Sequence, residues 1–134
     1  MREYLFHGKR KNINKWVEGT GIFFDGINTW LFSHDSTRPV EYDMEKFIVE
    51  PESVGQYTGM ADKNGKKIFE GDILDTPDRL IKVVWLKGNA QFDLEFVRYA
   101  HDKIITNFSG IEMRDLKEYE VVGNVFENKD LLEG

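Results

Sequence analysis

The sequence predicts an all-β protein, and three observations support that prediction. Residues 91–98 alternate apolar with polar side chains, and residues 80–86 are mostly apolar and rich in β-branched groups, as strands are. No window repeats apolar residues at three- and four-residue spacing over three helical turns. Aromatic residues form 13% of the 134 residues, which is enough for a core without covalent cross-links.

The first half of the chain is predicted to contain four strands and one hairpin. The strands are residues 2–7, 16–24, 29–32 and 46–49. Residues 25–28 read Asp-Gly-Ile-Asn, and glycine and asparagine tolerate the positive φ that a tight turn requires. We therefore expect residues 22–24 and 29–32 to pair as a hairpin.

The second half is predicted to contain strands at residues 67–76, 80–86, 91–98 and 119–126. Residues 87–90 read Lys-Gly-Asn-Ala and join the middle two strands as a second hairpin. Its core face is predicted to consist of Ile81, Val83, Trp85, Phe92, Leu94 and Phe96. The other face of residues 80–86 also carries apolar groups, so we expect that strand to be covered on both sides. Helix is expected only as single turns, at residues 113–117 and at residues 128–132 with Asn128 as N-cap.

Residues 54–75 contain two turns with a clear chemical basis. Asp62 can accept hydrogen bonds from amides two residues on, and Asn64-Gly65 suits a left-handed pair. Gly71 can adopt a positive φ, and Asp72 can accept from the amides that this bend frees. An apolar-Glu-Gly-Asp-apolar sequence of this kind is frequent in small barrels. We therefore expect a barrel-like or SH3-like C-terminal part, packed with an N-terminal β-hairpin part.

The whole chain, residues 1–134, is predicted to be a single domain. The alternative is a subdivision into an N-terminal β part at residues 1–53 and a C-terminal β part at residues 54–134. Residues 50–59 are the best boundary, because Pro51, Gly55 and Gly59 interrupt the strand pattern there.

Four short motifs resemble the signature of the YopX family. They are GQYTG at 55–59, DKNGK at 62–66, IFEGDIL at 68–74 and EVVGNVFEN at 120–128. The opening of the chain also resembles that family's usual start, so the resemblance spans nearly the whole sequence. It implies a mainly β fold and a phage or prophage origin. It implies no reaction, and it carries over no functional residues.

Composition excludes several kinds of chemistry. The chain has no cysteine, so disulfides, thiolate metal sites and a cysteine nucleophile are excluded. No segment has the roughly 20 apolar residues of a membrane helix, and the N-terminus lacks the apolar stretch of a signal peptide. We therefore expect a protein of the bacterial cytoplasm without a membrane partner. The formal net charge of −6 disfavours binding to nucleic acid.

No catalytic or metal-binding motif is present, so we expect neither an enzyme nor a cofactor. A calcium loop counted from Asp62 fails, since its fifth position is Lys66 and its twelfth is Ile73. The three histidines lack ligand spacing, no serine lies in a nucleophile elbow, and the glycines form no phosphate loop. The acidic cluster near the C-terminus is interpreted as a solvated face; it comprises Glu112, Asp115, Glu118 and Glu120.

Two surfaces remain as candidates for binding. The first, the basic N-terminal patch, combines cations with a ring and comprises Arg2, Lys9, Arg10, Lys11 and Trp16. Binders of single strands use this combination, because cations follow the backbone while rings stack on bases. The alternative is that Tyr4 and Phe6 form a core face and that the lysines and arginine form a polar turn.

The second candidate surface comprises Gln56, Tyr57 and Thr58, which lie between two glycines. An aromatic ring with polar neighbours suits an adaptable contact with another protein. The alternative is that Tyr57 packs inward. These surfaces lead to two hypotheses: a protein that acts by binding another protein, or a second copy of itself, and a nucleic-acid-binding β-barrel.

Overall fold

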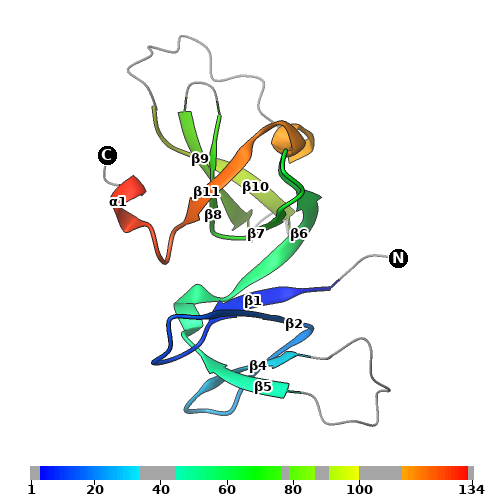
Figure 1. Cartoon of the computed structure of the whole chain (residues 1–134), viewed down its shortest axis with the longest axis vertical. Coiled ribbons are helices and arrows are strands. Elements are labelled where there is room, and N and C mark those ends of the chain that lie inside the picture. The colour runs from blue at the N-terminus through cyan, green and yellow to red at the C-terminus, as the bar shows by residue number, and fades with distance from the viewer. Residues whose placement is uncertain (1–3, 34–44, 77–78, 87–90, 100–112, 133–134) are drawn as a thin grey trace. The chain divides into compact units, whose positions relative to one another are not determined.

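The computed structural model describes residues 4–33, 45–76, 79–86, 91–99 and 113–132, and its strands pair in antiparallel fashion throughout (Figure 1). The all-β prediction is confirmed. The chain divides into two compact units, Met1–Tyr57 and Thr58–Gly134. Whether these are two domains or parts of one stays a prediction.

The first unit is built on two short sheets. Its elements are β1 (Phe6–Lys9), β2 (Trp16–Gly19), β3 (Gly21–Phe24), β4 (Thr29–Ser33), β5 (Glu45–Val49), the 3₁₀ turn η1 (Pro51–Ser53) and the beginning of β6 (Gly55–Ala61). β1 lies between β2 and β6, and β4 lies between β3 and β5. The single strand predicted at residues 16–24 is therefore two strands in two sheets. The chain changes sheet at Thr20, whose amide donates to the carbonyl of Phe32.

The predicted hairpin of β3 and β4 is confirmed. Phe23 lies opposite Trp30, and Phe24 lies opposite Thr29. Asp25 closes the turn, because its Oδ1 accepts from the amides of Ile27 at 2.8 Å and Asn28 at 2.7 Å. Gly26 has a φ of 97°, which a residue with a Cβ rarely adopts. Local side-chain chemistry thus determines this turn.

The two sheets of the first unit meet where β5 returns to β1. Arg10 bridges to Val49, and the neighbouring backbone bonds join Lys11 to Ile48 and Glu50 to Lys9. The core between the sheets contains the fully buried Leu31 and Val49. This return places the end of β1 beside the end of β5.

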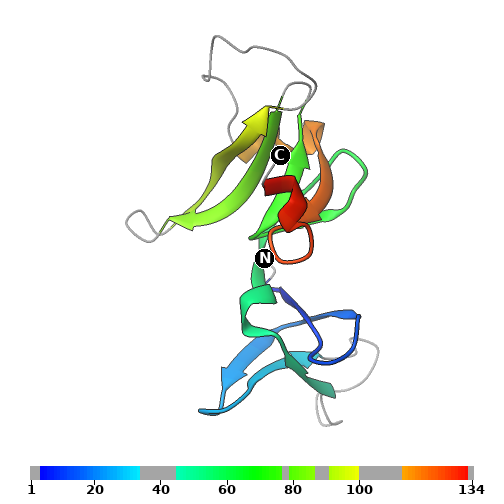
Figure 2. The same ribbon diagram turned by 90° about the vertical axis from the view of Figure 1, so that its left-hand side faces the viewer.

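The second unit contains one larger sheet, whose order is β10-β9-β8-β11, and the pair of β6 with β7. Its elements are the rest of β6, β7 (Lys67–Phe69), β8 (Asp72–Asp75), β9 (Arg79–Leu86), β10 (Gln91–Tyr99), the 3₁₀ helix η2 (Met113–Glu118), β11 (Glu120–Asn124) and α1 (Lys129–Leu132) (Figure 2). The strand predicted at residues 67–76 is interrupted at Gly71, whose φ is 92°. The described strands form no closed barrel, so the barrel-like description of this part does not apply to them.

The predicted pairing of β9 with β10 is confirmed, and the residues predicted for its core face lie opposite one another. Ile81 lies opposite Phe96, Val83 opposite Leu94 and Trp85 opposite Phe92. The turn predicted at residues 87–90 and the side chain of Phe96 lie outside the described residues. Trp85 lies at the margin of the core with 39% of its surface exposed, and its ring meets Phe92 edge-on at 5.0 Å.

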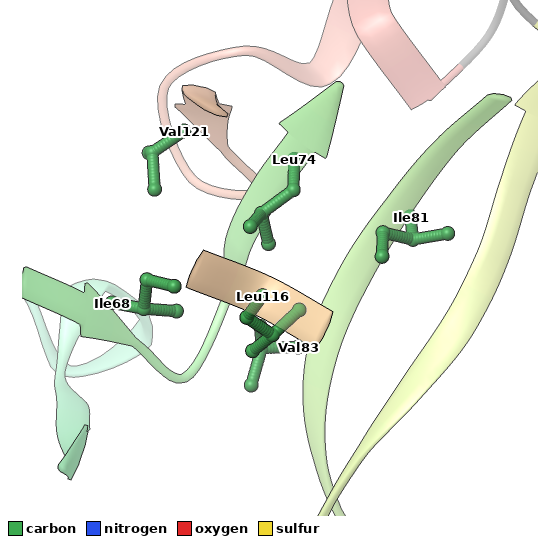
Figure 3. Packing of buried hydrophobic residues seen from close by; sticks show 6 residues of the cluster. All are labelled: Ile68, Leu74, Ile81, Val83, Leu116 and Val121. Atoms are coloured by element: carbon green, nitrogen blue, oxygen red, sulfur yellow. The ribbon is translucent and has the colours of Figure 1, made fainter. Parts of the chain in front are cut away.

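Both faces of the larger sheet are covered, as predicted for residues 80–86. One face carries the main core, to which η2 contributes Leu116 (Figure 3); its buried members are Ile68, Leu74, Ile81, Val83, Leu116 and Val121. The other face buries Ile73 and Leu80 beneath α1 and the segment before it, through Val125, Leu131 and Leu132. On this second face of β9, Leu80 is covered by apolar side chains. Lys82 lies on the same face, and its Nζ pairs with Oε1 of Glu95 at 3.2 Å.

The two predicted helical turns are present as η2 and α1. Asn128 immediately precedes α1, as an N-cap residue does. An N-cap oxygen would accept from an amide in the first turn of α1. Oδ1 of Asn128 accepts instead from the amide of Asn124, at the end of β11, at 3.0 Å.

Candidate functional site

The structure separates the members of the basic N-terminal patch. Lys9 and Trp16 lie opposite each other on the outer face of β1 and β2, where the rings of Trp16 and His7 are 4.8 Å apart. Arg10 instead lies over the ring of Phe47, 4.8 Å from its centroid. Lys11 is exposed in the turn that follows β1, and Arg2 lies outside the described residues.

The alternative that we predicted for this patch, a core face of Tyr4 and Phe6 beside a polar turn, fits only some of the residues. Phe6 is half-buried and lies on the face of β1 opposite to Lys9, whereas Tyr4 is 59% exposed. Arg10 to Lys15 form a hydrogen-bonded loop, in which the amide of Arg10 donates to the carbonyl of Lys15 at 2.9 Å. Lys11 thus belongs to a polar turn, while Lys9 and Arg10 flank two different aromatic rings.

The second predicted surface lies on β6 and is half-buried throughout. Gln56 lies opposite Phe6, and the amide of Tyr57 donates to the carbonyl of Leu5 at 2.7 Å. The hydroxyl of Thr58 donates to the carbonyl of Ile68 at 2.8 Å. Thr58 therefore helps to hold β6 to β7. Binding through these three residues stays a prediction.

An aromatic surface that the sequence did not reveal lies on the outer face of β3, β4 and β5. The ladders place Phe23, Trp30 and Ile48 in one row across the sheet, and Phe32 and Lys46 in the next. We call these five residues the aromatic face. Phe23 is 56% exposed, and Trp30, Phe32 and Ile48 are half-buried. An apolar row at the surface of a sheet is typical of a contact surface.

The indole of Trp30 is held from two directions. Its Nε1 donates to Oδ2 of Asp25 at 2.9 Å, and the ammonium of Lys46 lies 5.3 Å from its ring centroid. The pKa of Asp25 lies below its usual value because the carboxylate accepts from the amide of Asn28, from this indole and from the amide of Ile27. The Trp30 ring is therefore oriented before any partner binds.

Asp62 ties the turn at residues 62–66 to β11. Its Oδ1 accepts from the amides of Asn64 at 2.8 Å and Lys66 at 2.9 Å, and its Oδ2 accepts from the amide of Val121 at 3.0 Å. Burial alone would raise the pKa of this carboxyl, but the three amides and the charge of Lys66 outweigh burial and lower it. The predicted turn is confirmed, although Gly65 has a positive φ and Asn64 does not.

Asp72 performs the predicted task at the next bend. Its Oδ2 accepts from the amide of Phe69 at 2.8 Å, across the turn that Gly71 permits. The side chain is buried, and burial raises its pKa from 3.8 to about 7; the negative charge of Asp62 adds to the rise, while the Phe69 amide and Lys66 oppose it. These hydrogen bonds to backbone amides give Asp62 and Asp72 a structural role.

We expect Asp72→Asn to stabilise the protein above neutral pH. A raised folded-state pKa contributes stability below the unfolded value of 3.8, and this contribution is lost as the pH rises through about 7. The amide keeps an oxygen for the Phe69 donor but cannot ionise. Urea unfolding should show a gain of roughly 3 kcal/mol at about pH 8 and almost none near pH 4. Equal gains at both pH values would contradict the prediction.

Within residues 4–33, 45–76, 79–86, 91–99 and 113–132, no three histidine, aspartate or glutamate side chains gather as metal ligands would. In the same ranges, no helix has the length and apolar character that a membrane crossing requires.

The fold and surfaces define a small antiparallel β protein with two compact units and exposed aromatic side chains. A family model described as YopX protein matches residues 5–133. The chain belongs to the YopX family, as the four motifs indicated.

A solved structure and a curated relative are among the proteins similar to this chain. The crystal structure of protein EF1440 from Enterococcus faecalis superposes with a TM-score of 0.51, covering 98% of this chain and 99% of that one at 24% identity, and it supports the fold alone. The outer membrane protein assembly factor BamA of Nitratidesulfovibrio vulgaris is 31% identical over 111 residues. That match takes in 69% of this chain but only 14% of the length of BamA.

Proposed function

We propose that this chain is a non-catalytic phage or prophage accessory protein that binds another protein in the bacterial cytoplasm. The observation that supports the proposal is the aromatic face. Its row of Phe23, Trp30 and Ile48 is apolar, lies at the surface and crosses three strands of one sheet. Tryptophan is the residue type most often found at the energetic centre of protein interfaces.

The chemistry of this face selects a particular kind of partner segment. Trp30 offers a pre-oriented apolar ring, so little side-chain entropy is lost on binding. Lys46 is exposed beside that ring and offers a positive charge. The complementary segment places an apolar side chain against Trp30 and a carboxylate within reach of Lys46.

The test is affinity capture from cells in which the prophage has been induced, using Trp30→Ala and Lys46→Glu. Trp85→Ala is the matched control, because it removes an exposed tryptophan from the second unit. We expect one stoichiometric protein partner to bind the wild type and Trp85→Ala, to bind Lys46→Glu at least about 10-fold more weakly, and to be lost with Trp30→Ala. Equal capture by all four proteins would overturn the proposal.

Binding to single-stranded nucleic acid is the second candidate function. Lys9 beside Trp16 and Arg10 over Phe47 favour it, since a cation next to a ring suits a nucleotide. The net charge of −6 opposes it. In the same experiment, a labelled oligonucleotide retained at low salt, released at high salt and lost on charge reversal of Arg10 and Lys11 would favour this function instead.

A further inference from the structure

One strand at the edge of a sheet differs in charge from all the other described edge strands. The sheet orders place β2, β3, β5, β7, β10 and β11 at edges. Of these strands, β3 reads Gly-Ile-Phe-Phe and carries no charged residue. Each of the other five carries at least one, such as Glu18 in β2 and Lys67 in β7. Proteins place charges on edge strands to prevent pairing with other chains. β3 lacks that protection.

Among the described residues, no strand pairs with the outer edge of β3, so its backbone groups there have no ladder partner. The amide of Asp25 donates to the carbonyl of Asn28, so these two residues form a hydrogen-bonded pair. Along an antiparallel ladder, hydrogen-bonded pairs alternate with pairs that are not hydrogen-bonded. The next hydrogen-bonded pair is therefore Phe23 with Trp30. The N–H and C=O groups of Ile22 and Phe24 consequently point away from β4, toward the free edge.

Both faces of β3 are apolar at this edge. Phe23 belongs to the aromatic face and is 56% exposed. Phe24 lies on the opposite face by strand alternation and is 64% exposed. The face that carries Phe24 is the one on which Leu31 is buried, yet Phe24 itself stays exposed. Both edge phenylalanines can therefore still bury apolar surface against a further strand.

We propose that β3 pairs antiparallel with β3 of a second copy of this chain, which forms a two-fold symmetric dimer through a continuous sheet. In this register Phe23 lies opposite Phe23 of the second copy. Ile22 lies opposite Phe24 and exchanges both backbone hydrogen bonds with it. A two-fold axis through the Phe23 pair satisfies the edge groups of both copies at once.

The composition of β3 favours a second copy as the occupant. Any strand that docks here lies beside Phe23 on one face and Phe24 on the other, so apolar side chains on it bury more apolar surface than charged ones do. β3 itself is uncharged and carries apolar groups on both faces, so it matches its own edge. Ile22 of one copy then covers the exposed Phe24 of the other. The inference does not depend on the proposed function, because partner capture is tested at Trp30.

The test is sedimentation equilibrium of the full chain over a concentration series, with two edge variants. Phe24→Lys restores the protective charge, and Ile22→Pro removes an N–H that faces the free edge while leaving the ladder to β4 intact. Ile27→Lys is the matched control, since Ile27 is an exposed large apolar residue of the adjoining turn, at 86% exposure, and lies off the edge. Circular dichroism establishes that each variant is folded.

We expect the wild type and Ile27→Lys to be dimers and the two edge variants to dissociate at least about 100-fold more readily. A wild type that stays monomeric at about 100 μM would overturn the inference. So would a dimer that persists in both folded edge variants. Loss of the dimer in Trp30→Ala but not in Phe24→Lys would place the contact on the aromatic face and equally overturn it.

Discussion

Replacing Gly19 with alanine is expected to destabilise the first unit by about 3 kcal/mol or more. A Cβ at this position would lie 2.1 Å from the carbonyl oxygen of Phe32 and 2.6 Å from Cδ2 of Leu31. The first contact is with backbone and the second with a fully buried side chain, so neither can move aside cheaply. Gly19 is therefore required for β2 to pass close to β4 where the chain changes sheet.

Gly21→Ala is the matched control for this prediction. A Cβ at Gly21 meets only the side chain of Phe32, at the ordinary contact distance of 3.9 Å. The added methyl should be neutral or stabilise by up to about 1 kcal/mol, because it restricts the unfolded chain. Tryptophan fluorescence in urea, in a Trp85→Phe background, reports on Trp16 and Trp30 of the first unit. Similar midpoints for both variants would refute the role assigned to Gly19.

Asp62→Ala is expected to cost about 3 kcal/mol or more in the second unit. The change removes a carboxylate that accepts from three backbone amides, and it leaves the buried amide of Val121 without its acceptor. A buried amide that loses its partner incurs the full desolvation penalty. Because Val121 belongs to the main core, the loss should loosen β11 as well as the turn.

Asp62→Asn separates these two effects. Its oxygen can still accept from the amides of Asn64 and Lys66, but its NH₂ group faces the N–H of Val121. We expect a smaller loss, with hydrogen exchange faster at Val121 and unchanged at Lys66. Equal losses of unfolding free energy in Asp62→Ala and Asp62→Asn would contradict the proposed connection between the turn and β11. Slow hydrogen exchange at the Val121 amide in both variants would contradict it as well.

Predictions that depend on local chemistry were largely correct. The turn at residues 25–28 lies where we expected it, and Asp62 and Asp72 are the acceptors that we expected at the next two turns. These bonds were predictable because they join a side-chain oxygen to amides two to four residues away. The hairpin of β9 and β10 also follows its alternation, since pairing between adjacent strands needs only a short connection.

Predictions that depend on distant parts of the chain were incomplete. The strand expected at residues 16–24 breaks because Gly19 must approach Phe32, and no pattern within that strand shows this contact. The members of the basic N-terminal patch are near in sequence, yet Arg10 packs on Phe47, which β5 contributes. The aromatic face was missed because residues 29–32 are apolar on both sides, so alternation alone does not say which side is buried.

The sequence alone determined that this protein is all-β and where the turns at residues 25–28 and 62–66 lie, because turn chemistry and strand alternation act over a few residues. Its motifs also indicated the YopX family. The tertiary structure alone decided which apolar side chains stay at the surface and which edge strand lacks charge. Those outcomes depend on how β3, β4 and β5 align, since the face and edge of a strand acquire their surroundings only when its neighbours are in place.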